Sequence, residues 1–100
     1  MRQEINILGN QVQVNLFGSL YVEEASILRK NLLCHIDKGY KDFLVNLAGL
    51  DYIDSSGLGV LVGIQKRAVE RGGGIVISGL KGTVKDLFEL TRLTKVFEVR

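Results

Sequence analysis

The sequence contains no proline and no tryptophan, and it has one cysteine and one histidine in 100 residues. Without proline, the turns must depend on glycine and on the side chains of asparagine and aspartate. One cysteine excludes an intrachain disulfide and agrees with a reducing compartment. One histidine and one cysteine are also too few for a structural zinc site. We therefore expect neither a disulfide nor a bound metal, and we assign no cofactor.

A long apolar segment and a strong excess of one charge are missing as well. With 13 basic and 11 acidic residues, the formal net charge is +2, and the basic residues are scattered instead of forming the stripe typical of nucleic-acid binding. The longest apolar run, Leu58 to Ile64, is interrupted by glycine and is far shorter than the roughly 20 residues of a membrane helix. No apolar segment of a signal peptide follows residues 1–4. These absences predict a cytoplasmic protein that neither enters a membrane nor binds nucleic acid.

The sequence that remains is typical of one globular domain over residues 1–100, with 46% hydrophobic and 24% charged residues. Alternating apolar and polar residues predict strands over 4–8 and 11–16, joined by a turn at Gly9-Asn10. The alternation stops at Gly18-Ser19.

Apolar spacings of three and four predict helices in the rest of the chain, and compact apolar runs predict strands. In order, these are a helix from about residue 22 to the glycine at 39, a strand over 43–47, a loop over 48–54, a helix over 55–71, a strand over 75–77, a helix over 84–91 and a strand over 96–99. The order predicts an α/β domain with a mixed, mostly parallel sheet. The N-terminal hairpin would supply its one antiparallel strand, and about three helices would pack on it.

The segment from Asp51 to Gly59 carries the candidate site, because it joins the end of a buried strand to the start of a helix. Partners and ligands of open α/β sheets bind at this edge. A helix N-terminus also offers free N–H groups and a partial positive charge, which suit a phosphoryl group. Asp54, Ser55 and Ser56 are all good helix caps, and a helix needs only one.

Helix capping does not explain the glycines in the first turns of this helix. Gly57 and Gly59 each cost up to about 1 kcal/mol relative to alanine, and Gly63 follows one turn later. Close approach of a partner or a phosphoryl donor would explain them, and so would tight packing of the helix on the sheet.

Two stretches of the chain resemble a known family. Leu44-Val45-Asn46-Leu47 and the run from Tyr52 to Leu61 are similar to the core of the bacterial anti-sigma factor antagonists, in the STAS domain family. The resemblance extends over nearly the whole chain, and the segment from Leu87 to Glu98 is similar to the closing helix and strand of the family. It implies a regulatory protein, not an enzyme.

The resemblance also implies a mechanism. The serine directly after the aspartate is the phosphorylation site in this family, which by position is Ser55. The unphosphorylated antagonist binds an anti-sigma factor serine kinase, and a sigma factor is released; the phosphorylated antagonist cannot bind until a serine phosphatase resets it. We expect the partner to contact the following residues: Asp54, Ser56, Gly57, Leu58, Gly59, Gly63, Ser19 and Tyr21.

The chain departs from the family pattern in four places. The acidic turn after the second strand is replaced by Gly18-Ser19-Leu20-Tyr21, and Asn46 stands where the central strand usually ends with aspartate. The sequence stops at Arg100, where many relatives continue into another helix. His35 and Cys34 match no family site.

Enzyme chemistry is the first alternative, and the motifs argue against it. Residues 53–57 lack the first glycine of the Gly-x-Ser-x-Gly motif of serine hydrolases, and Leu80 stands where a P-loop requires lysine. A second alternative stays open. STAS-like domains also serve, without a phosphorylation cycle, as interaction subunits of lipid-transport ATPases or signalling complexes.

Overall fold

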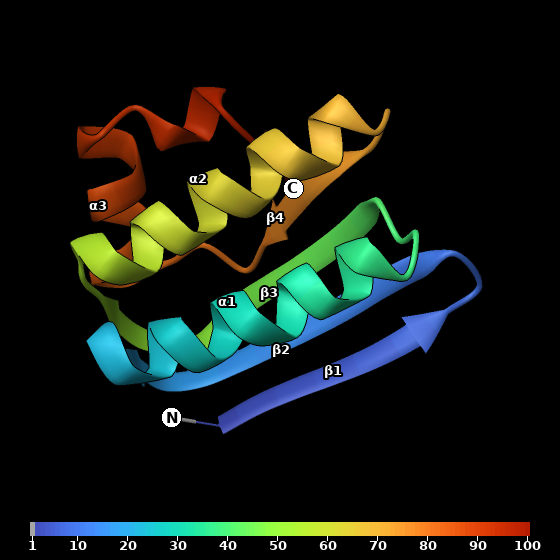
Figure 1. The fold of residues 1–100 in the computed structure, drawn as a ribbon. Helices are drawn as coiled ribbons and strands as arrows, with labels where there is room; N and C mark the ends of the chain where they lie inside the picture. The colour runs from blue at the N-terminus through green and yellow to red at the C-terminus, as the bar shows by residue number, and fades with distance from the viewer. Residues whose placement is uncertain (1) are drawn as a thin grey trace.

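The computed structural model describes residues 2–100, which form a five-stranded sheet and three helices (Figure 1). The strands are β1 (Arg2–Leu8), β2 (Gln11–Leu20), β3 (Asp42–Ile53), β4 (Gly74–Ser78) and β5 (Glu98–Val99). The helices are α1 (Val22–Asp37), α2 (Ser55–Glu70) and α3 (Gly82–Leu90), and a 3₁₀ turn (Leu93–Lys95) precedes β5. The order of strands and helices predicted from the sequence is confirmed.

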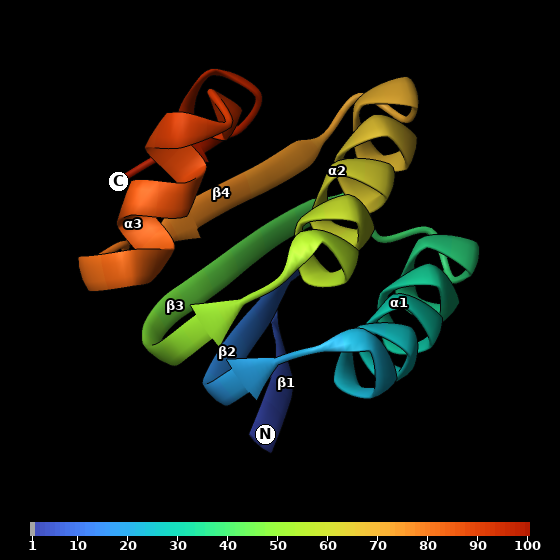
Figure 2. The same ribbon diagram turned by 90° about the vertical axis from the view of Figure 1, so that its left-hand side faces the viewer.

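The strands lie in the sheet in their chain order, β1-β2-β3-β4-β5. The β1–β2 hairpin is antiparallel and the other pairs are parallel, as predicted. Figure 2 shows α1 and α2 on one face of the sheet and α3 on the other. None of the helices within residues 2–100 is long and apolar enough to cross a membrane.

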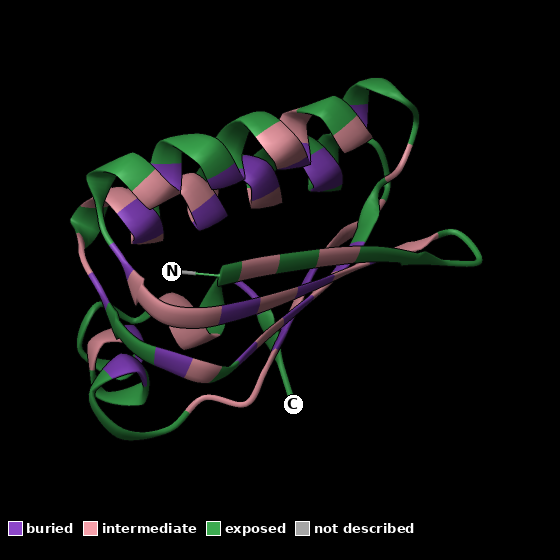
Figure 3. Ribbon diagram, turned by 90° about the horizontal axis from the view of Figure 1, so that it is seen from below, coloured by how far each residue is buried: buried purple, intermediate pink, exposed green. Residues whose placement is uncertain are grey.

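The core forms where alternate strand residues meet the apolar stripes of the helices (Figure 3). Val12, Val14 and Leu16 of β2 are fully buried, and the same alternation continues in β3 and β4. Four residues of α1 at helical spacing face this layer, namely Ala25, Leu28, Leu32 and Ile36. The core holds α1 and α2 against the sheet and thereby fixes the start of α2 at the sheet edge.

Two predicted boundaries are wrong, and both concern strands that run on toward the candidate site. β2 continues through Gly18-Ser19 to Leu20, because a register shift disturbs the alternation without ending the pairing with β3. The predicted loop over 48–54 is strand as far as Ile53. Within this stretch, Gly49 pairs with Phe17 of β2, and a side chain at Gly49 would collide with the Phe17 ring.

The end of the chain differs in a smaller way. The strand predicted over 96–99 is only Glu98–Val99, and the 3₁₀ turn occupies the residues before it. Arg92, at the start of this turn, has a left-handed backbone (φ 60°), and Phe97 returns to the core beside Phe88. The turn therefore replaces most of the expected strand.

Candidate functional site

The ends of β2 and β3 and the start of α2 meet at one edge of the sheet. Ser19 pairs with Tyr52, and the backbone N–H of Asp54 donates to the carbonyl oxygen of Leu20 at 3.2 Å. This hydrogen bond connects the residue before α2 to Leu20, which directly precedes Tyr21. The segment around Ser19 and Tyr21 therefore lies beside the start of α2, although more than 30 residues separate them in the sequence.

Asp54 caps α2. Its backbone is extended (φ −99°, ψ −177°), its Oδ1 accepts the N–H of Gly57 at 3.1 Å, and its carbonyl oxygen accepts the N–H of Leu58 at 3.1 Å. Of the three residues that could have been the cap, Asp54 therefore holds that position, and Ser56 is its neighbour in the first turn. Neither Ser55 nor Ser56 serves as the cap of α2.

Ser55 is the first residue of α2, and its side chain is exposed. Within residues 2–100, the Ser55 hydroxyl forms no hydrogen bond. The first turn of α2 contains no acidic residue. The hydroxyl is therefore accessible to a modifying enzyme, and the positive end of the helix dipole would favour a phosphoryl group there.

The three glycines of α2 have different surroundings. A Cβ atom at Gly57 would lie 2.7 Å from Cγ1 of Ile53 and 2.9 Å from Cγ of Leu20, so Gly57 lets the helix pack tightly on the strand ends. At Gly59 and Gly63 a Cβ atom would meet nothing within 4 Å. Of the two explanations offered for the glycines, internal packing therefore holds for Gly57 only. At Gly59 and Gly63, the outer face of α2 carries no side chain, although the structure has room for one.

An exposed aromatic pair at the same edge was not assigned from the sequence. The rings of Tyr21 and Tyr52 lie 5.6 Å apart, and 47% and 38% of these residues are exposed. Tyr21 was an expected partner contact, whereas Tyr52, although it lies in the candidate segment from Asp51 to Gly59, was not; only the register of β2 and β3 brings the two rings together. Exposed tyrosines are common anchors of protein interfaces.

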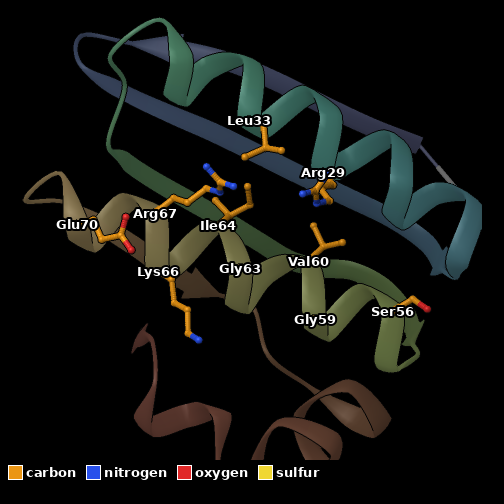
Figure 4. Close-up of a pocket in the computed structure, with 10 residues that line it drawn as sticks. All are labelled: Arg29, Leu33, Ser56, Gly59, Val60, Gly63, Ile64, Lys66, Arg67 and Glu70. Carbon is orange, nitrogen blue, oxygen red and sulfur yellow. The ribbon is translucent and has the colours of Figure 1, made fainter.

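A groove of about 590 Å³ runs between α1 and α2 and begins at Ser56 (Figure 4). Leu33 of α1 and Ile64 of α2 line it together with Gly59 and Gly63. The groove was not predicted from the sequence, because its two walls come from different helices. The lining residues of α2 recur every three or four residues from Ser56 to Glu70, and this spacing could have indicated that they share one face of the helix.

The one histidine of the chain lies away from this edge. His35 lies in the last turn of α1, about 20 Å along the helix axis from Tyr21, and its Nδ1 hydrogen-bonds the carbonyl oxygen of Asn31 at 2.7 Å. Across the part of the chain that the structure describes, no three His, Cys, Asp or Glu side chains are grouped to hold a metal ion. Asn46 lies within β3, where its Oδ1 accepts the N–H of Ala48.

Comparison with known proteins identifies the family. The STAS domain model matches residues 2–100. The anti-sigma-B factor antagonist of Bacillus subtilis is 33% identical over 90 residues, which are 90% of this chain and 82% of that protein. A crystal structure from Thermotoga maritima superposes with a TM-score of 0.91 at 26% identity, over 97% of this chain and 84% of that one.

The fold is also that of SpoIIAA from Bacillus in its phosphorylated form, with a TM-score of 0.82 at 20% identity over 99% of this chain and 91% of that one. The order β-β-α-β-α-β-α-β agrees with these similarities. The chain belongs to the STAS domain family, among its anti-sigma factor antagonists.

Proposed function

We propose that this protein is a cytoplasmic, non-enzymatic switch that is controlled by phosphorylation of Ser55. Unmodified, it binds an anti-sigma factor serine kinase at the edge formed by Ser55, Tyr21 and Tyr52, and a sigma factor is released. Phosphorylation of Ser55 ends the binding, and a serine phosphatase restores it. The observation that carries the proposal is the exposed Ser55 hydroxyl at the first position of a helix already capped by Asp54.

The fold should tolerate phosphorylation of Ser55. The hydroxyl is exposed, its loss as a donor breaks no hydrogen bond within residues 2–100, and the cap depends on Asp54 instead. A phosphoryl group adds nearly two negative charges, which the N-terminus of α2 stabilises. The modification therefore acts on docking and leaves the fold intact.

A docked partner should not tolerate the same group. A partner that covers the start of α2 removes water from the phosphate, and an uncompensated buried charge costs several kcal/mol. Asp54 and the exposed Asp51 would add repulsion from nearby carboxylates. Phosphorylation is thus expected to shift the equilibrium strongly toward the free protein.

The relatives support this proposal in two ways. The Bacillus subtilis relative is an anti-sigma-B factor antagonist, so an anti-sigma factor is the partner class to test first. SpoIIAA has been solved in an unphosphorylated and in a phosphorylated form, both with the same fold as this chain. The fold is therefore compatible with both states of a switch.

Calorimetric titration with the anti-sigma factor from the same cells tests the proposal. We expect Ser55→Ala to bind whether or not ATP is present, and Ser55→Asp to bind at least about tenfold more weakly, which corresponds to about 1.4 kcal/mol. Asn10→Asp is the matched control, since it adds one charge at the exposed turn before β2, at the opposite end of that strand. Equal affinity of Ser55→Asp and Asn10→Asp would place Ser55 outside the interface.

A further inference from the structure

We propose that the groove between α1 and α2 receives an acidic amphipathic helix of the anti-sigma factor. This inference rests on the proposed function, because the helix is assigned to the same partner. It adds a second contact region, with its own chemistry, to the edge around Ser55.

The shape of the groove suits a helix. Side chains of Arg29 and Leu33 reach into it from α1, and those of Val60, Ile64 and Arg67 reach into it from α2 (Figure 4). Leu33, Val60 and Ile64 give it an apolar floor that packs against the core. From Ser56 to Glu70 the groove follows α2 for about 21 Å, the length of a helix of four turns.

The charges of the groove select an acidic occupant. Arg29 and Arg67 are exposed and stand on opposite walls, and Glu70 is the one acidic residue in the lining. Within residues 2–100, neither arginine lies within 4.0 Å of a carboxylate, since the ion pairs there join Arg2 to Glu4 and Arg100 to Glu98. Two unpaired guanidinium groups beside an apolar floor match a helix that presents leucine-like side chains flanked by Asp or Glu.

The glycines of α2 fit the same occupant. Gly63 lines the groove, and a Cβ atom there would meet nothing within 4 Å, so the fold itself does not require glycine. A bare helix face allows the backbone of a second helix to approach closely. Alanine would otherwise be favoured by up to about 1 kcal/mol.

The size of a standard interface leaves room for a second contact region. A standard interface buries about 800 Å² on each partner, roughly one seventh of the 5590 Å² that this chain exposes. The edge around Ser55, Tyr21 and Tyr52 would supply part of this area, and the groove would extend it. The groove continues directly from Ser56 and Gly59, and it reaches Arg67, about 18 Å along α2 from Ser55.

Binding of the full-length protein to the anti-sigma factor tests the inference with three paired variants. Arg29→Glu/Arg67→Glu reverses the groove charges, and Arg29→Gln/Arg67→Gln removes them more mildly. The control Lys38→Glu/Lys41→Glu makes the same charge change at exposed positions between α1 and β3. Thermal unfolding followed by circular dichroism verifies that each variant folds, and the neutral pair is used if the reversal does not fold.

We expect the charge reversal to lower the affinity at least about tenfold at an ionic strength of about 0.05 M, and the control to lower it less than about threefold. The difference should shrink in about 0.5 M salt, because exposed charges are then screened.

Several results would overturn the inference. If the groove variants bind like the wild type while Ser55→Asp loses binding, the switch is supported and the groove is not part of the interface. Tighter binding after charge reversal would show that the occupant is basic, and an equal loss in the control would show a general charge effect. If neither the groove variants nor Ser55→Asp change the affinity, the proposed function itself fails.

Discussion

Replacing Gly57 by alanine should destabilise the fold, whereas the same replacement at Gly59, two residues further along α2, should stabilise it. Both residues lie in the same helix, so both gain the helical preference of alanine, up to about 1 kcal/mol. They differ in their surroundings. Gly57 faces the fully buried Leu20 and Ile53, and Gly59 faces open space.

The magnitude at Gly57 follows from the contacts that the new methyl group would make. Its distances of 2.7 Å to Cγ1 of Ile53 and 2.9 Å to Cγ of Leu20 are too short, and neither atom is the free end of a flexible side chain. Overpacking of this kind costs about 1–3 kcal/mol. After the helical gain is subtracted, we expect Gly57→Ala to lose about 1 kcal/mol and Gly59→Ala to gain about 0.5–1 kcal/mol.

Urea unfolding measures both changes. With a slope of about 1–3 kcal/mol per molar urea, the two transition midpoints should move in opposite directions by a few tenths of a molar or more. A Gly57→Ala variant as stable as Gly59→Ala would contradict the tight seating of α2 on the ends of β2 and β3.

Three further outcomes are expected at the same edge. Asp54→Ala should lower the free energy of unfolding by about 1 kcal/mol in urea, because it removes the α2 cap, and Asp54→Asn should restore most of the loss. Gly59→Ala should weaken binding to the anti-sigma factor in calorimetry even though it stabilises the helix; stronger binding would show that no close approach occurs there. Tyr21→Ala should reduce the same affinity about tenfold, whereas Ile27→Ala, a similarly exposed apolar residue of α1, should not, and equal effects would exclude an anchor at Tyr21.

The sequence was sufficient for the architecture because each element carries its own period. The apolar spacing of α1 and the alternation of β2 are local signals, and each helix or strand was assigned correctly from them. Two strand ends were wrong for a non-local reason. β2 and β3 support each other past Gly18 and Gly49, where neither strand shows a clear pattern by itself.

At the candidate site, too, local features could be predicted from the sequence and non-local ones could not. Ser55 at the start of α2 could be predicted, since a helix start and a run of capping residues are visible in the sequence. The identity of the cap could not, because Asp54, Ser55 and Ser56 are all suitable and only the hydrogen bond to Gly57 distinguishes them. The Tyr21–Tyr52 pair and the groove between α1 and α2 depend on strand register and helix packing, which no local pattern reports.

Phosphopeptide mapping after incubation with ATP and the anti-sigma factor kinase from the same cells is the most direct test of the switch. We expect one phosphoryl group, on Ser55, and none in Ser55→Ala. We also expect the modified protein to leave the complex. An unmodified Ser55 together with a complex that is stable in the presence of ATP would exclude the switch and would indicate an interaction subunit that is not regulated by phosphorylation.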